Sequence, residues 1–103
     1  FYDQCFTAVV NTVGQVFPSV YAYEAFVPSF GGTWGFVIGS LGPGPVSLSD
    51  DETDRRVADR VDGRLRMFDA TAQRGMFSLP RYLREGIANE TRVIPRDKPL
   101  FVV

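Results

Sequence analysis

The sequence contains no histidine, and this absence excludes Ser-His-Asp catalysis, Cys-His catalysis and histidine-ligated metal centres. Its one cysteine, Cys5, excludes an internal disulfide framework and fits a reducing compartment. Gly, Pro, Ser or Asn interrupts every apolar run before it reaches the ~20 residues of a membrane-spanning helix. Eleven basic and twelve acidic residues leave a net charge of −1, so we expect no nucleic-acid partner.

Charged side chains are also scarce in the first half of the chain. Residues 1–49 carry only Asp3 and Glu24, whereas residues 50–103 carry the other twenty-one charges. A small free-standing domain buries only ~60–65% of its unfolded surface and must cover the rest with polar groups. We therefore expect the first half to be covered partly by residues outside this chain. The start at Phe1, without an initiator methionine or a signal sequence, also suggests a piece of a longer protein.

The first 40 residues predict one helix followed by a pair of strands. Residues 3–17 carry apolar side chains at helical spacing, and Pro18 ends that pattern. Residues 20–27 and 34–39 are rich in aromatic and β-branched side chains, which favours strands. The short Gly31-Gly32 loop between them indicates an antiparallel hairpin. Many α/β sheets finish at one edge in this way.

The rest of the chain predicts a linker and a helical segment. Residues 41–48 contain two glycines and two prolines, which is typical of a linker. Residues 49–103 form the C-terminal helical segment, and we expect all three parts to belong to one larger domain. Ser49, three residues before Glu52, has the spacing of a helix cap.

Apolar residues in this segment indicate which faces are buried. The helix that follows Ser49 is predicted to carry a narrow apolar stripe of Val57, Val61 and Leu65. A short buried segment is predicted at Phe68, Met76 and Phe77. A last helix is expected to begin at Pro80, to turn Tyr82, Leu83 and Ile87 inward, and to end near Asn89.

Most chemical functions find no support in the pattern. The acidic run at 50–54 lies at a helix start and lacks the glycine and ligand spacing of a calcium loop, so we assign it to capping. No glycine-rich phosphate loop leads from a strand into a helix. Cys5 has no basic neighbour to activate it and is interpreted as an inert packed thiol. We therefore expect no catalytic, metal-binding or cofactor-binding residue within this chain.

Aromatic residues on both sides of the Gly31-Gly32 turn form the one suggestive constellation. Phe30 and Trp34 could wall a pocket at the end of a sheet and hold an aliphatic or cationic substrate by apolar and cation–π contact. On the residues alone, the simpler interpretation is that they fill the core of the hairpin. The pattern alone leaves both interpretations open.

Two segments carry a family resemblance that extends from Phe1 to about Ile87. Residues 27–36, V-P-S-F-G-G-T-W-G-F, resemble the stretch V-P-T-Y-P-G-G-x-W-x-F of spermidine synthases, the polyamine aminopropyltransferases. Residues 74–83, R-G-M-F-S-L-P-R-Y-L, are similar to that family's H-R-x-x-F-x-L-P-x-x-L. Phe30 replaces a tyrosine, Gln73 replaces a histidine, and the turn is shorter by a proline. These departures suggest a divergent substrate or a weakly active relative.

The resemblance implies an α/β fold, namely the C-terminal portion of a Rossmann-like, methyltransferase-type sheet with an antiparallel edge hairpin and short helices after it. It implies transfer of an aminopropyl group from decarboxylated S-adenosylmethionine to a polyamine acceptor such as putrescine. Phe30 and Trp34 would bind the acceptor amine. The nucleotide motifs and the catalytic aspartate of the family precede this region, so the segment alone would bind no cofactor and be inactive.

The same resemblance implies partners and a location. We expect a small-molecule polyamine, the upstream Rossmann-like part of the same protein, a homodimer, and a cytoplasmic protein. The shortened turn also resembles the family branch in which the synthase domain is fused to membrane helices. The alternative function is a non-catalytic interaction or dimerisation module that uses an exposed aromatic hairpin.

Overall fold

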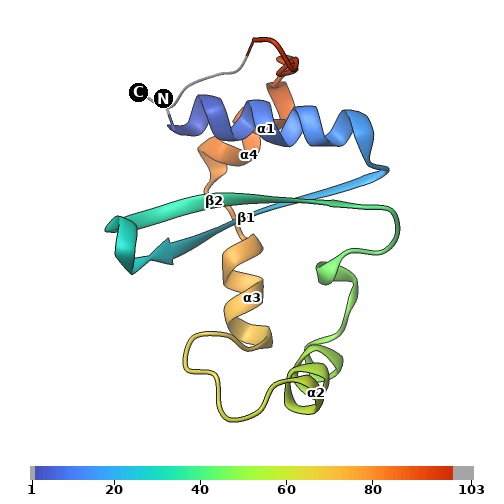
Figure 1. The fold of residues 1–103 in the computed structure, drawn as a ribbon, viewed down its shortest axis with the longest axis vertical. Helices are drawn as coiled ribbons and strands as arrows, with labels where there is room; N and C mark the ends of the chain where they lie inside the picture. The colour runs from blue at the N-terminus through green and yellow to red at the C-terminus, as the bar shows by residue number, and fades with distance from the viewer. Residues whose placement is uncertain (1, 99–103) are drawn as a thin grey trace.

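A two-stranded antiparallel sheet forms the centre of the fold in the computed structural model, which describes residues 2–98 (Figure 1). Strands β1 (Ser19–Val27) and β2 (Gly32–Ser40) pair along their whole length, with Ser19 opposite Ser40 and Val27 opposite Gly32. The chain reverses through a single 3-10 turn, Pro28–Phe30, and then Gly31. The hairpin predicted from the sequence is confirmed, and so is the α/β character of the chain.

Helices α1 (Tyr2–Val16) and α4 (Arg81–Asn89) cover one face of this sheet (Figure 1). Phe6 and Val10 of α1 and Leu83 of α4 form the buried core, and each is at most 5% exposed. Partly buried side chains from the sheet and from the flanks of α4 pack around them: Val20, Ala22, Val37, Leu79 and Ile87. The expected first helix is confirmed, because its apolar face is what closes this core.

Helix α3 (Ala70–Phe77) lies on the opposite face of the sheet (Figure 1). Tyr23 of β1 and Phe36 of β2 stack with ring centroids 5.1 Å apart, and Phe77 stands 5.0 Å from Tyr23. Two residues later, Leu79 already packs into the core on the α1 side. The segment 74–83 therefore passes from one face of the sheet to the other and packs against both.

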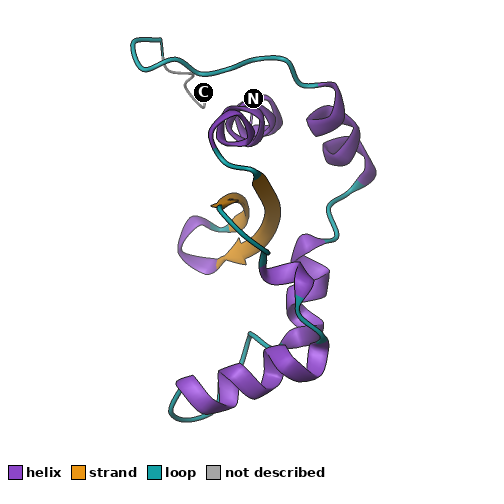
Figure 2. Cartoon of the chain, turned by 90° about the vertical axis from the view of Figure 1, so that its right-hand side faces the viewer, coloured by secondary structure: helices purple, strands orange, loops and turns teal. Residues whose placement is uncertain are grey.

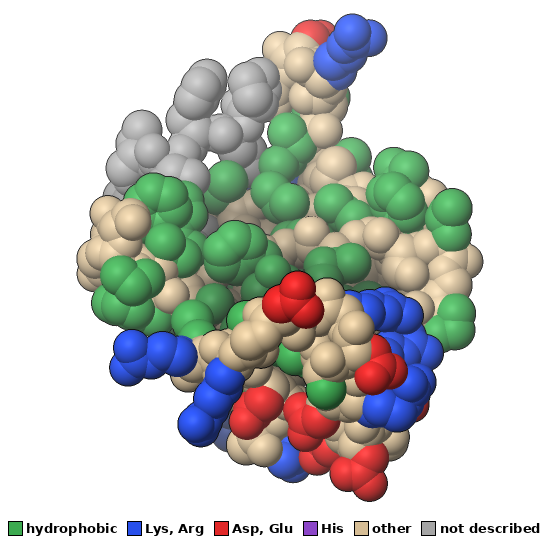
Figure 3. Space-filling view, turned by 60° about the horizontal axis from the view of Figure 1, so that its bottom comes forward, with side chains coloured by type: hydrophobic (Ala, Val, Ile, Leu, Met, Phe, Trp, Pro, Cys, Tyr) green, Lys and Arg blue, Asp and Glu red, His purple; other side chains and the backbone are tan. Residues whose placement is uncertain are grey.

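Helix α2 (Asp50–Arg60) lies at the end of the molecule away from the strands, and charged side chains gather over it (Figures 2 and 3). Its expected cap is confirmed, since the Glu52 N–H donates to Ser49 Oγ over 3.2 Å. The carboxylate of Glu52 faces Arg55 and Arg56, whose hydrogen bonds lower its pKa to about 2.

The apolar stripe predicted for α2 holds for the half-buried Val57 but is wrong for the two residues after it. The helix ends at Arg60, so Val61 only follows its last turn and Leu65 lies in the loop beyond Gly63, whose φ is 80°. Val61 and Leu65 are 37% and 42% exposed, and the buried side chain of α2 is Thr53. The stripe assumed a helix that continues about one and a half turns beyond Arg60, which the glycine-containing sequence does not form, and the main packing of α2 is on α3 rather than on the sheet.

One residue of α4 also differs from expectation. Tyr82 is 62% exposed, whereas the adjacent Leu83 is fully buried. Successive residues of a helix point about 100° apart, and with Leu83 directed at the core the Tyr82 side chain lies on the exposed side of α4. Ile87, one turn after Leu83, does pack against it. Pro80 stands just before the helix, which ends at Asn89 as predicted.

The linker at 41–48 is anchored at its middle. Gly44 is buried, and its N–H donates to the Tyr21 hydroxyl over 3.1 Å. The amide of Gln73 donates to the Pro45 carbonyl over 3.3 Å, within the short 3-10 turn Pro45–Ser47. These contacts hold the linker against β1 and α3, on the face of the sheet that α3 covers.

A buried carboxylate ties the chain beyond α4 to α1. Glu90, 5% exposed at its side chain, accepts hydrogen bonds from the Thr7 hydroxyl at 2.6 Å and from the Arg92 guanidinium at 2.6 and 2.8 Å. Further along, the Ile94 N–H donates to Thr12 Oγ1 over 2.9 Å. The hydrogen bonds from Arg92, supported by that from Thr7, hold the pKa of the Glu90 carboxyl well below its usual range.

Replacing Gly44 with alanine should destabilise the chain. A Cβ at Gly44 would collide with the Tyr21 ring, whereas a Cβ at Gly42 would meet nothing within 4 Å, and neither glycine has a positive φ. We expect G44A to lower the free energy of unfolding in urea by about 1–3 kcal/mol, the usual cost of overpacking. The matched variant G42A should stay within about 0.5 kcal/mol of the parent. Equal effects of the two would contradict the anchored linker.

The Glu90 contacts predict an acid-sensitive fold. A depressed pKa means that the carboxylate stabilises the folded state above its ordinary pKa of 4.5 and loses this effect as the pH falls below that value. E90Q should lower the free energy of unfolding by about 2 kcal/mol near neutral pH and make stability less dependent on pH below 4.5.

The control for this prediction is E85Q. Glu85 pairs with Arg81 at 2.9 Å, but the two side chains are 61% and 84% exposed. Its loss should cost less than about 0.5 kcal/mol and leave the acid dependence unchanged. Urea unfolding of the three proteins at neutral and acid pH measures both effects, and a parallel acid response of E90Q and parent refutes the assignment.

Candidate functional site

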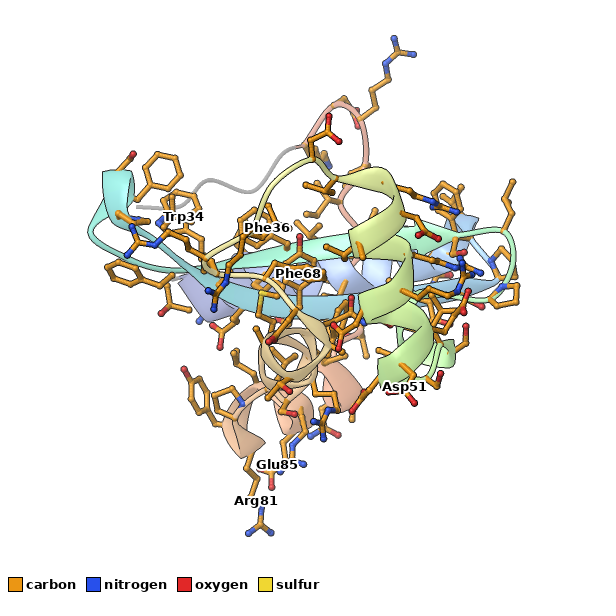
Figure 4. The ribbon with its side chains drawn as sticks, turned by 90° about the horizontal axis from the view of Figure 1, so that it is seen from below. Trp34, Phe36, Asp51, Phe68, Arg81 and Glu85 are labelled. Carbon is orange, nitrogen blue, oxygen red and sulfur yellow. The ribbon has the colours of Figure 1, made fainter. Side chains whose placement is uncertain are left out.

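The two aromatic residues singled out in the sequence meet at the closed end of the hairpin. The rings of Phe30 and Trp34 lie with centroids 4.6 Å apart and planes at 42°. They come together because Gly31 adopts a left-handed φ of 68°, which side chains with a Cβ rarely tolerate. Phe30 is 61% exposed and Trp34 45% exposed, so the pair lies at the surface rather than in the core. Figure 4 shows Trp34 at one end of the hairpin.

An apolar groove of about 630 Å³ runs from Trp34 along β2. Cys5, Phe6, Val9 and Val13 of α1 form one side, and five consecutive residues of β2, 33–37, form the other. Consecutive residues point to alternate faces of a strand, so a groove lined by all five follows the backbone edge of β2. Sequence reasoning did not locate this groove, because it depends on the angle between α1 and the sheet.

The edge of β2 lacks the features that protect open strands. Over Gly32–Ser40 the strand has no charge and no proline, whereas exposed edges normally carry such residues. Within residues 2–98 β2 pairs only with β1, and its other side faces the groove. Such an edge is suited to burial against further protein.

The acidic residues at 50–54 serve the packing of α2. Asp54 accepts the N–H of Ala70 over 2.9 Å, Asp50 lies 3.2 Å from Arg74, and Glu52 is held by two arginines. Residues 2–98 hold no group of three or more side chains placed to bind a metal ion. In the same range no helix has the length and apolar character to cross a membrane. Cys5 is half-buried in the groove, and its inertness stays a prediction.

The fold and the turn together define a segment of an α/β protein whose aromatic hairpin end is free to contact a ligand. No family model matches the chain. It is 36% identical over 99 residues to a polyamine aminopropyltransferase of Sulfurisphaera tokodaii, and this match covers 96% of this chain and 33% of that protein. A polyamine aminopropyltransferase of Sulfolobus acidocaldarius is 38% identical over 95 residues, and one of Saccharolobus solfataricus is 33% identical over 99 residues.

The chain spans about a third of the length of the curated relatives it matches. It is thus a segment homologous to the C-terminal part of polyamine aminopropyltransferases, and the family predicted from its two motifs is confirmed. Both motifs lie inside the matched region, which includes nearly the whole chain.

The exposure of Trp34 predicts a small effect on stability. Because 45% of its surface is already exposed, W34A should lower the free energy of unfolding by only about 1 kcal/mol. F6A removes a core ring that is 5% exposed and should cost about 3–5 kcal/mol. Urea unfolding of both variants distinguishes an exposed ring from a core ring. Comparable losses of unfolding free energy in W34A and F6A would show that Trp34 is part of the core.

Proposed function

We propose that this chain is the C-terminal segment of an aminopropyltransferase and that its Phe30–Trp34 turn forms one wall of the acceptor-amine site. The observation that carries the proposal is the exposed ring pair, held 4.6 Å apart on a preformed turn. This turn lies in the part of the sequence that resembles the family most clearly. Two largely exposed rings at a rigid chain reversal suit contact with the methylene chain of a diamine, and their faces attract its ammonium groups.

The proposed reaction joins the acceptor amine to the aminopropyl group of decarboxylated S-adenosylmethionine. The nitrogen lone pair attacks the carbon next to the sulfonium, a C–N bond forms, the C–S bond breaks, and methylthioadenosine leaves with the electron pair. The amine then gives up one proton to an acceptor in the upstream part of the protein. Since the sulfonium is already an activated leaving group, Phe30 and Trp34 would contribute by orienting the amine.

The upstream part would also hold the nucleotide. We propose that the sheet continues into it as a Rossmann-like sheet, which this hairpin completes, and that residues 1–103 alone bind no cofactor and are inactive. The uncharged edge of β2 and the apolar groove beside α1 support this view, because both need a covering partner. The homodimer and the cytoplasmic location implied by the resemblance stay predictions.

A second candidate function is an interaction or dimerisation module. Phe26, 54% exposed, stands near the same end of the hairpin as Phe30 and adds to an apolar surface there. Apolar patches of this kind commonly mark protein contacts. Light scattering on the chain, with F30A as the comparison, tests the idea, and a monomer at high concentration for both proteins contradicts it.

The acceptor-amine proposal predicts a selective kinetic defect in the longer protein that contains this chain. W34A should raise KM for putrescine about ten-fold, as expected from losing ~1–2 kcal/mol of contact with a flexible cation. The KM for decarboxylated S-adenosylmethionine should change little, because its binding residues lie upstream.

Leu41 provides the matched control for this experiment. It is an exposed apolar residue, 83% exposed, that follows the opposite end of β2. L41A should leave both KM values unchanged. Residues 1–103 alone, given both substrates, should form no spermidine above background. Proportionate loss of both substrates in W34A, or turnover by the isolated chain, contradicts the proposed arrangement.

A further inference from the structure

A second cavity lies on the α3 face of the sheet, next to the end of the hairpin that carries Trp34, because Ala25, the cross-strand partner of Trp34, lines it. It has a volume of about 410 Å³, within the usual range for small-molecule sites. Its walls come from the two strands, from α3, from the loop before α3 and from Pro45 of the linker, and the aromatic and sulfur-containing residues among them are Tyr23, Phe36, Met67, Phe68, Met76 and Phe77. Figure 4 shows Phe36 and Phe68 in the middle of the molecule, with Trp34 at one end of the hairpin. Because walls stand on three sides, this is a pocket rather than an open sheet face.

The chemistry of these walls is neutral and aromatic. No charged residue lines the cavity, so an ammonium group placed there would lose its water without gaining a counter-ion. The pocket is therefore unsuited to the polyamine proposed for the hairpin end. Four rings and two thioethers are the groups that pack best against another ring, since sulfur and ring edges both attract aromatic faces.

One amide side chain lies in the wall of the cavity. Gln73 lines it, and its Nε2 donates to the Pro45 carbonyl over 3.3 Å, which holds the side chain in place. The stacked pair of Tyr23 and Phe36, centroids 5.1 Å apart, and the contact of Phe77 with Tyr23 make the opposite walls rigid. The loop wall is more open, with Met67 62% exposed at the rim. A ligand would enter from this side.

We propose that this cavity binds a neutral, flat aromatic or heteroaromatic ring, at a site that adjoins the Phe30–Trp34 turn but contains neither of its two rings. The ring lies between the sheet rings and the loop that carries Met67 and Phe68, and the Gln73 amide is the polar group available to its edge. The proposal does not depend on the aminopropyl-transfer function, because none of its residues belongs to the Phe30–Trp34 turn.

The chain contains only two methionines, and both line the cavity, so their methyl groups report on it selectively. The experiment is a titration of the methyl-labelled chain with indole, followed by NMR, with 1,4-diaminobutane as the charged comparison. We expect indole to shift both methyl signals in a saturable way and diaminobutane to shift neither. F68A should weaken indole binding about ten-fold, because one of the ring walls is lost.

Two further variants keep the outcome interpretable. M67A changes a residue that is already mostly exposed and should weaken binding without affecting folding, which covers the case of an unstable F68A. F30A, at the hairpin end, should leave indole binding unchanged. The proposal is overturned by absent or non-saturable shifts, by equal shifts with diaminobutane, or by equal losses in F30A and F68A. The same titration on the longer protein must also show binding; its failure there means that upstream residues fill the cavity, which overturns the proposal too.

Discussion

The fold depends on covering both faces of a two-stranded sheet that would not be stable in water by itself. An isolated hairpin is marginal, because its backbone and apolar side chains stay exposed on both faces. Here the charge-poor sequence of β1 and β2 makes both faces apolar, and the chain has to supply a layer for each. Helices α1 and α4 supply one, and α3 supplies the other (Figure 1). Helix α2, which packs mainly on α3, belongs to neither layer.

The crossing between the two faces explains why the second motif has its spacing. Phe77 contacts Tyr23 on one side of the sheet, while Leu79 and Leu83 pack with Phe6 on the other. The crossing falls between Phe77 and Leu79, and Pro80 then starts α4 at once. Within this segment, the motif at residues 74–83 packs on both faces of the sheet and so holds the hairpin between two helical layers.

Burial within the described chain is incomplete along β2, and this bears on function. The groove beside α1 and the uncharged strand edge stay open within residues 2–98, and the chain spans about a third of its relatives' length. The turn with Phe30 and Trp34 stands clear of both helical layers. A ring pair that contributes little to the core is free to serve recognition, which is why the turn rather than the buried Phe6 is the candidate site.

The sequence by itself determined the local structure: the hairpin from its β-branched runs and glycine loop, the start of α2 from Ser49, and the family from two motifs. These features depend on neighbouring residues and on backbone preferences that are legible along the chain. Only the tertiary structure decided that Tyr82 faces outward, that Val61 and Leu65 lie beyond α2, and that Glu90 is buried against α1. Which face of a helix is covered depends on the layer that packs against it, and contacts such as that between Thr7 and Glu90 join residues more than eighty positions apart. The cavity beside α3 has the same origin, because the rings of the two strands had to meet those of residues 68–77, which are distant in sequence, before one pocket could form.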